Sequence, residues 1–225
     1  MEWLQNEKLL SDIIAKINDA RTKSHVERCD RYFEAINSLY SAYYQYRKRN
    51  NKLTNEEERQ RKRPGDKRSF EELIKQGIDQ EAQIRWLKSK EVRSLVGFSP
   101  AIMSDEELNA QKYDPNNIDP LTRTIASAKH NDLKAFYDEF LKGRSFFAPL
   151  AALCDLIYMV RCNLKHCGKT PKGPDRDKAK RDNDVCSTVV PVLDFLFQII
   201  FENPDERLAV YGTLKRGECN HEVVA

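Results

Sequence analysis

Residues 149–166, PLAALCDLIYMVRCNLKH, decide the fold. Apolar side chains recur in this stretch at spacings of three and four, which predicts a helix with one buried face. Pro149 suits the first turn of such a helix. The predicted buried stripe consists of Leu150, Leu153, Cys154, Ile157, Arg161 and Leu164. Because Arg161 falls on this face, its guanidinium must be paired with an anion or must face a second subunit.

Similar spacing elsewhere predicts further helices. Leu10 to Ile17 and Tyr32 to Tyr43 repeat apolar residues at helical intervals, with a polar turn or a break around residues 22–24. Thr54 to Glu57 has the acids of a helix start, and Pro64-Gly65 is a stop signal. The pattern Ser69-x-x-Glu72 predicts a capping box that opens the next helix. The predicted buried stripe of that helix consists of Ile74, Ile78, Trp86 and Leu87.

The second half of the chain continues the helical pattern after a predicted loop over residues 113–120. A short helix is expected over residues 131–141, ended by Gly143. The last helix is expected over residues 182–201, with Pro191 inside it as a kink. The side chains expected to point inward are Leu133, Phe136, Tyr137 and Phe140 in the first helix, and Val185, Val189, Val192, Leu196 and Ile199 in the second.

Composition agrees with an all-α protein. Only 8 Gly and 9 Pro occur in 225 residues, and strand-like sequence is nearly absent before residues 207–212. We therefore expect a helical domain over residues 1–203, with a charged, irregular insertion over 47–131 and a short β-like tail over 207–225. No run approaches the ~18–20 apolar residues of a membrane span, and the first residues do not read as a signal peptide. A cytoplasmic protein with no membrane partner is expected.

Charge is concentrated locally although the net charge is only +3. Residues 47–68 hold ten Lys or Arg against four acids, a net of +6, which indicates either a solvated helix surface or RNA contact. Beside this basic segment, Tyr40, Tyr43, Tyr44 and Tyr46 form an aromatic stripe that either stacks bases or belongs to the core, more often the core.

Cysteines and histidines give no pattern of metal ligands. The six cysteines include no Cys-x2-Cys pair, so free thiols are expected and no metal site is predicted. His25 and His130 lie in polar sequence and are expected at the surface.

One motif carries functional information. The run from Val160 to Lys169 places His166 five positions after Arg161, at a helix end, and the charged sequence Asp175-Arg176-Asp177 follows. This segment resembles the active segment of HEPN domains, whose hallmark is an Arg, four to six residues, and a His. The resemblance implies a helical bundle that acts as a metal-independent endoribonuclease, without a cofactor. It also implies a homodimer in a toxin or antiphage defence setting, with RNA as substrate and an antitoxin or activator as a further partner.

The residue types are consistent with this chemistry. A histidine with an ordinary pKa near 6.5 exchanges protons at neutral pH, and an arginine can donate two hydrogen bonds to two phosphate oxygens. We therefore expect Arg161 to hold the phosphate, His166 to be the acid or base, and Asn163 to support them, with Lys165 and Lys169 on flanking phosphates. On a straight helix Arg161 and His166 point about 140° apart, which favours a site shared between two subunits.

Two alternatives remain open. Many HEPN members have Asn, Asp or His directly after the Arg, whereas this chain has Cys162. The first alternative is the nuclease described above. In the second, the chain is a non-catalytic helical module that dimerises and binds a partner protein or nucleotide. Arg161 then forms a structural ion pair and His166 acts as a helix cap.

The tail resembles a second, unrelated family. Residues 210–221, VYGTLKRGECNH, are similar to the opening strand and loop of the gamma-glutamylcyclotransferase-like fold, where Tyr-Gly-Thr-Leu binds substrate. Since 225 residues end long before such a domain closes, we expect no cyclotransferase activity in this chain.

Overall fold

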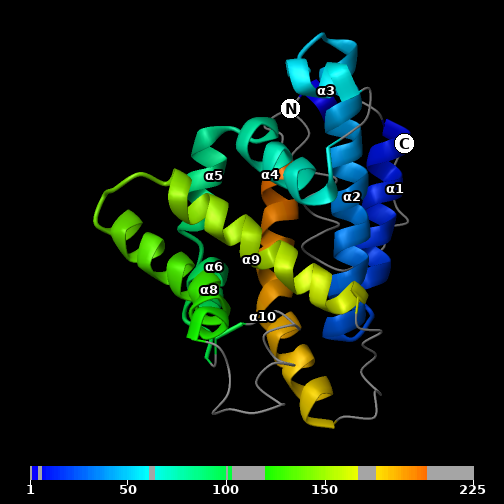
Figure 1. Ribbon diagram of the computed structural model, residues 1–225. Helices are drawn as coiled ribbons and strands as arrows, with labels where there is room; N and C mark the ends of the chain where they lie inside the picture. Colours follow the sequence, from blue (N-terminus) through cyan, green and yellow to red (C-terminus); the bar gives the residue numbers. More distant parts are fainter. Residues whose placement is uncertain are drawn as a thin grey trace.

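The computed structural model describes residues 2–4, 7–60, 64–99, 101–102, 120–166 and 176–201, and every regular element in these ranges is a helix (Figure 1). The predicted all-α fold is confirmed. The β-like tail over 207–225 lies outside the described residues. The elements are η1 (Glu2–Leu4), α1 (Glu7–Ala20), α2 (His25–Arg49), α3 (Asn55–Gln60), α4 (Asp66–Gly77), α5 (Gln80–Leu87), α6 (Lys90–Val96), α8 (Pro120–Leu141), α9 (Phe147–His166) and α10 (Arg176–Phe201).

The polar residues 21–24 separate two antiparallel helices, α1 and α2. Ser24 caps α2: its hydroxyl accepts from the Glu27 amide at 3.4 Å, and the Glu27 carboxylate accepts from the Ser24 amide at 3.3 Å. This reciprocal pair satisfies two amides that have no partner within the helix. Residues 22–24 therefore mark a break, which the sequence had left open.

The predicted helix from Ser69 is divided differently in the structure. α4 begins at Asp66, so Ser69 lies inside the helix and its hydroxyl donates to the Pro64 carbonyl at 3.0 Å instead of capping. Asp79 and Ser89 cap α5 and α6, accepting from the Ala82 amide at 2.8 Å and the Val92 amide at 3.1 Å. Side-chain oxygens that accept backbone amides favour new helix starts, and the single long helix becomes three short ones.

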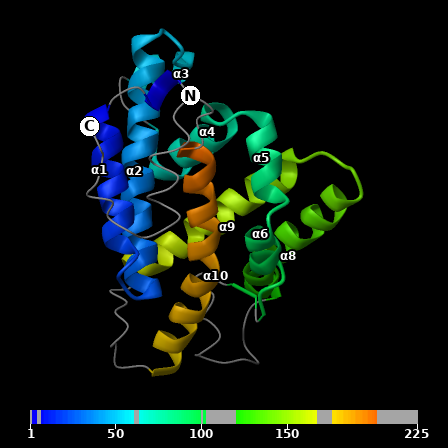
Figure 2. The ribbon, with the colours of Figure 1, turned by 180° about the vertical axis from the view of Figure 1, so that it is seen from behind.

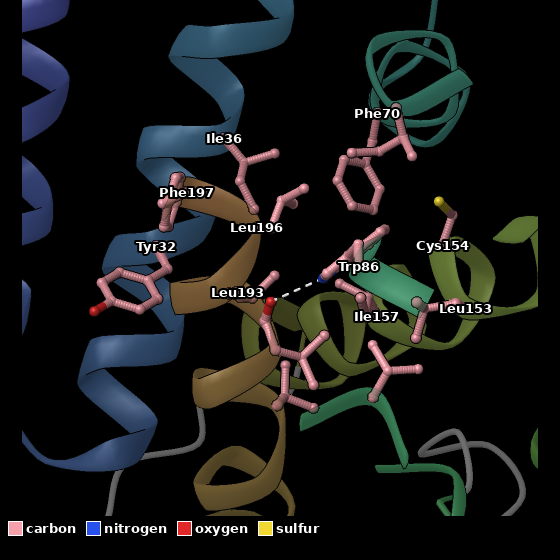
Figure 3. Close-up of a cluster of buried hydrophobic side chains, with 14 of the residues drawn as sticks. Tyr32, Ile36, Phe70, Trp86, Leu153, Cys154, Ile157, Leu193, Leu196 and Phe197 are labelled. Atoms are coloured by element: carbon pink, nitrogen blue, oxygen red, sulfur yellow. Dashed lines mark hydrogen bonds between the residues drawn. The ribbon is translucent and has the colours of Figure 1, made fainter. Parts of the chain in front are cut away.

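These short helices form the core with α2, α9 and α10. Trp86 lies at their meeting point, 1% exposed, and its indole donates to the Val192 carbonyl of α10 at 3.1 Å (Figure 3). The predicted stripe of Ile74, Ile78, Trp86 and Leu87 is buried. The described part of segment 47–131 is thus mainly helical and supplies core residues, which differs from the expected irregular insertion.

The second half of the chain contains the longest helices. α8 starts at Pro120, so part of the predicted loop and the residues before 131 are helical. Gly143 follows α8 with φ of 87°, as expected of a helix-ending glycine. Phe136 is 43% exposed, so its inward prediction was wrong, while Leu133, Tyr137 and Phe140 are buried. All five residues predicted to point inward from α10 are buried, and Pro191 lies inside this helix.

Two helices are longer and more apolar than the sequence analysis expected. Residues Phe147–Leu164 and Lys180–Phe201 have mean hydropathies of 1.4 and 1.7, enough by length and composition to cross a membrane. Of these two windows, 50% and 61% are buried inside the fold, and core helices of soluble proteins meet the same criteria of length and hydropathy. Figures 1 and 2 show the central position of α10 among the other helices.

Arg47, inside the basic segment, is a buried ion-pair centre. It is 3% exposed and donates to Glu57 at 2.7 Å and to Glu72 at 2.8 Å, and its guanidinium also bonds the Lys52 carbonyl. Burial acts to raise the pKa of Glu57, but hydrogen bonds with Thr54 and the charge of Arg47 lower it below its usual value. Arg47 therefore joins α2, α3 and α4 and is not available to RNA in this fold.

His130 is the second buried polar centre, contrary to its expected surface position, whereas His25 is exposed. The Ile102 amide donates to Nδ1 of His130 at 2.9 Å. The proton therefore lies on Nε2, which faces the carbonyls of Leu95 and Val96 at 3.2 Å each. These carbonyls end α6, where helical partners run out. Burial lowers the pKa of His130.

We expect Arg47→Ala to destabilise the protein by about 3–5 kcal/mol, because it removes the counter-charge of the buried Glu57 carboxylate, whereas Glu72 keeps its ion pair with Arg68. The matched control, Arg49→Ala on the exposed side of α2, should change stability by less than about 0.5 kcal/mol. Urea unfolding measures both variants. A loss below about 1 kcal/mol for Arg47→Ala would contradict the ion-pair assignment.

His130 should make stability depend on pH. Because its folded-state pKa is below the ordinary value of about 6.5, the unfolded chain takes up a proton that the folded chain refuses. The contribution of His130 to the free energy of unfolding is complete above about pH 6.5. As the pH falls below this value, the free energy of unfolding decreases by up to about 1.4 kcal/mol per pH unit. His130→Gln, which keeps a donor and an acceptor, should lose this slope between about pH 6.5 and 5.5, and His25→Gln should keep it. Identical slopes for all three proteins in urea unfolding would refute the assignment.

Candidate functional site

The site predicted from sequence lies on α9, which passes in front of α10 in Figure 1. The predicted buried stripe of this helix is confirmed: Leu150, Leu153, Cys154, Ile157 and Arg161 are buried and Leu164 is half-buried. The partly exposed positions follow the same helical spacing on another side of α9. This outward face of α9 consists of Ala148, Ala151, Ala152, Asp155, Tyr158 and Cys162.

Arg161 is 8% exposed and is held from two sides. Its Nη2 donates to Oδ2 of Asp66, at the start of α4, at 2.7 Å, and its Cζ lies 5.3 Å from the ring centre of Tyr158. Burial acts to lower the pKa of the guanidinium, but the hydrogen bond with Asp66 and the nearby charges of Asp66, Tyr40 and Tyr158 together raise it. The paired guanidinium that the sequence required is therefore present within one chain.

One buried donor of Arg161 is left over. Its Nε–H has no hydrogen-bond partner among the described residues. An unsatisfied buried donor costs free energy, and more so on a charged group. Arg161 and Asp66 therefore share one hydrogen bond, whereas a bidentate pair has two, with two donors bonded to two oxygens.

A second ion pair joins the same two helices with the signs exchanged. Nζ of Lys67, on α4, lies 2.8 Å from Oδ1 of Asp155, on α9. The hydrogen bond to Asp155 raises the pKa of Lys67. Both side chains are more exposed than Arg161, at 50% and 36%, so solvent weakens this pair. The first turn of α4 is therefore attached to α9 by two adjacent ion pairs of unequal burial.

Tyr158 and Cys162 lie one turn apart beside Arg161. Burial raises the pKa of the Tyr158 phenol, and the hydrogen-bonded Cys162 thiol raises it further. Tyr158 is therefore neutral near pH 7 and has an O–H to donate. Cys162 occupies the position directly after the arginine, and its contact with Tyr158 places its thiol at the outward face of α9.

Of the other predicted site residues, only Asn163 has a described side chain, and it lies on a different side of α9 from Arg161. Asn163 comes two residues later, about 160° around the helix, and lines a cavity of about 20 Å³ with Arg181 and Cys186 of α10. α9 remains helical through His166, which keeps His166 about 140° from Arg161. The side chains of Lys165 and His166, and all of Lys169, lie outside the described residues.

The aromatic stripe of α2 belongs to the core, as its spacing favoured. Tyr40, Tyr43 and Tyr44 are buried. Tyr46 is half-buried, with Nζ of Lys52 5.0 Å from its ring centre. Tyr46 also borders a hollow of about 1070 Å³ on the outer side of α2, which Asn37, Ser41, Gln45 and Arg49 line at four-residue intervals. Arg161 and Asn163 do not take part in this hollow.

Sequence reasoning missed two residues of the site. Tyr158 precedes Arg161 by three positions, and this helical spacing is a signal that would have found it. Asp66 is 95 positions away from Arg161, and only the packing of α4 against α9 brings the two together. No local pattern points to such a pair.

The comparisons leave the family open. The chain matches no protein-family model, no curated protein and no solved structure.

Proposed function

We propose that this chain is a metal-independent endoribonuclease that works as a homodimer, in a toxin or antiphage defence setting in the cytoplasm. The observation that carries the proposal is the state of Arg161, a buried cation that binds a single carboxylate oxygen and has a buried Nε–H to spare. Carboxylate and phosphate oxygens are equivalent partners for a guanidinium. A site of this kind has the right charge and donors for a phosphate of RNA.

The reaction follows from the residue types. The ribose 2′-oxygen loses its proton and attacks phosphorus, the bond from phosphorus to the 5′-oxygen breaks, and the leaving oxygen takes up a proton. His166 acts as the acid or base, and Arg161 stabilises the negative charge that builds up on the phosphate oxygens. Asn163 supports the site as a polar group, and Lys165 and Lys169 bind the flanking phosphates.

A dimer is proposed because of the directions in which Arg161 and His166 leave α9. Positions 161 and 166 of one helix point about 140° apart, so one subunit does not readily direct both side chains at one phosphate. A two-fold axis beside α9 would bring position 166 of one copy toward Arg161 of the other. The outward face of α9 suits such a contact, because Ala148, Ala151 and Ala152 permit close approach of two helices.

A second candidate function has its own support. The ion pair between Arg161 and Asp66 accounts for the burial of the guanidinium by structure alone. Cys162 also departs from the polar residue that many HEPN nucleases have after the arginine. In this alternative the chain is a non-catalytic helical module that dimerises and binds a partner protein, such as an antitoxin or activator, or a nucleotide.

Cleavage of mixed RNA in excess EDTA distinguishes the two functions. We expect cleavage by the wild type, with cyclic phosphate ends, and a loss of at least about 100-fold for His166→Ala and for Arg161→Gln. His25→Ala, which removes an exposed histidine, is the matched control and should retain full activity. Size-exclusion chromatography and thermal unfolding check that the variants keep the fold and the dimer. An inactive wild-type dimer favours the interaction module, and equal cleavage by all variants indicates a contaminating nuclease.

A further inference from the structure

The two partners of the Arg161–Asp66 pair differ in exposure. The side chain of Arg161 is 10% exposed, whereas that of Asp66 is 33% exposed. The carboxylate is therefore the more solvent-exposed partner of the pair. One carboxylate oxygen meets one guanidinium nitrogen, and the buried Nε–H stays without a partner among the described residues. Asp66 thus occupies an anion site without using all of its donors.

We propose that Asp66 is an internal competitor for the RNA phosphate at Arg161. Its carboxylate takes the place of a phosphate oxygen and is displaced when RNA binds. This inference rests on the proposed function, because it takes Arg161 to be the phosphate ligand, and it adds the regulation of that site. The resting protein then binds RNA more weakly than its arginine alone would allow.

The position of Asp66 permits this displacement. Asp66 is the first residue of α4 and follows Gly65, around which a side chain would meet nothing within 4 Å. The buried residues of α4 that anchor it in the core, Phe70, Leu73 and Ile74, begin one turn later. The carboxylate can therefore turn toward solvent while the helix keeps its core contacts.

The guanidinium keeps its support when Asp66 leaves. The ring of Tyr158 lies against the guanidinium from the same helix and does not involve Asp66. A carboxylate that remained beside a bound phosphate would repel it, since like charges a few ångströms apart oppose each other strongly in a partly buried site. Displacement thus has an electrostatic driving force once the phosphate arrives.

The test measures RNA binding separately from cleavage. A labelled single-stranded 2′-O-methyl RNA has no free 2′-hydroxyl and is not cleaved by the proposed reaction, and its binding is followed by fluorescence anisotropy at one fixed low salt concentration. We expect Asp66→Asn to bind about tenfold more tightly than the wild type, the size of an ordinary coupling between two sites. In the Arg161→Gln background, Asp66→Asn should produce no gain, because the competition requires the guanidinium.

Asp155→Asn is the matched control. It removes the same charge and the other ion pair between α4 and α9, but it leaves Arg161 and Asp66 untouched. A gain for Asp66→Asn that exceeds that of Asp155→Asn and disappears without Arg161 supports the competitor. Equal gains for both variants, a gain that persists without Arg161, or unchanged or weaker binding by Asp66→Asn would overturn it. Absence of cleavage of ordinary RNA by the wild type would instead count against the nuclease, so the two failures are distinct.

Discussion

A guanidinium on the buried face of a core helix has to be given a counter-charge, and the arrangement around α9 depends on this constraint. Arg161 continues a stripe of leucine and isoleucine, so the packing that buries Leu153 and Ile157 also takes its charge out of water. The cost of burying a charge is recovered only when an anion lies in contact with it. Asp66 meets that need from the first turn of α4, and the Lys67–Asp155 pair beside it joins the same two helices.

The other two buried polar centres, Arg47 and His130, have more of their polar atoms in hydrogen bonds than Arg161 has. Arg47 spreads its donors over Glu57, Glu72 and the Lys52 carbonyl, and each ring nitrogen of His130 faces backbone groups. Such closed networks hold helices together. The buried Nε–H of Arg161 has no hydrogen-bond partner among the described residues, and the side chain of its partner Asp66 is 33% exposed. The proposed function rests on this donor of Arg161.

The sequence patterns predicted the positions and buried faces of the helices more accurately than the residues at which the helices begin and end. Periodicity predicted the buried faces of α9 and α10 residue by residue, because helical spacing is a local property. The capping box at Ser69 was wrong because packing extended α4 back to Asp66, and the same hydroxyl then bonded Pro64 instead. Phe136 was predicted to point inward but is exposed, and His130 was predicted at the surface but is buried, where its partners come from α6 and Ile102. Arg161 was correctly expected to be buried and paired, but its partner was not identifiable.

The sequence by itself determined that this protein is helical and that Arg161 is a buried cation needing an anion, since both follow from residue spacing and the cost of desolvating a charge. It also determined that positions 161 and 166 point apart on one helix. Only the tertiary structure decided that Asp66 is the anion, that Tyr158 supports the guanidinium and that Arg47 and His130 belong to the interior. Tyr158 lies only three positions before Arg161, but the other contacts join different helices that are distant in the sequence, and no local pattern encodes which helices come into contact.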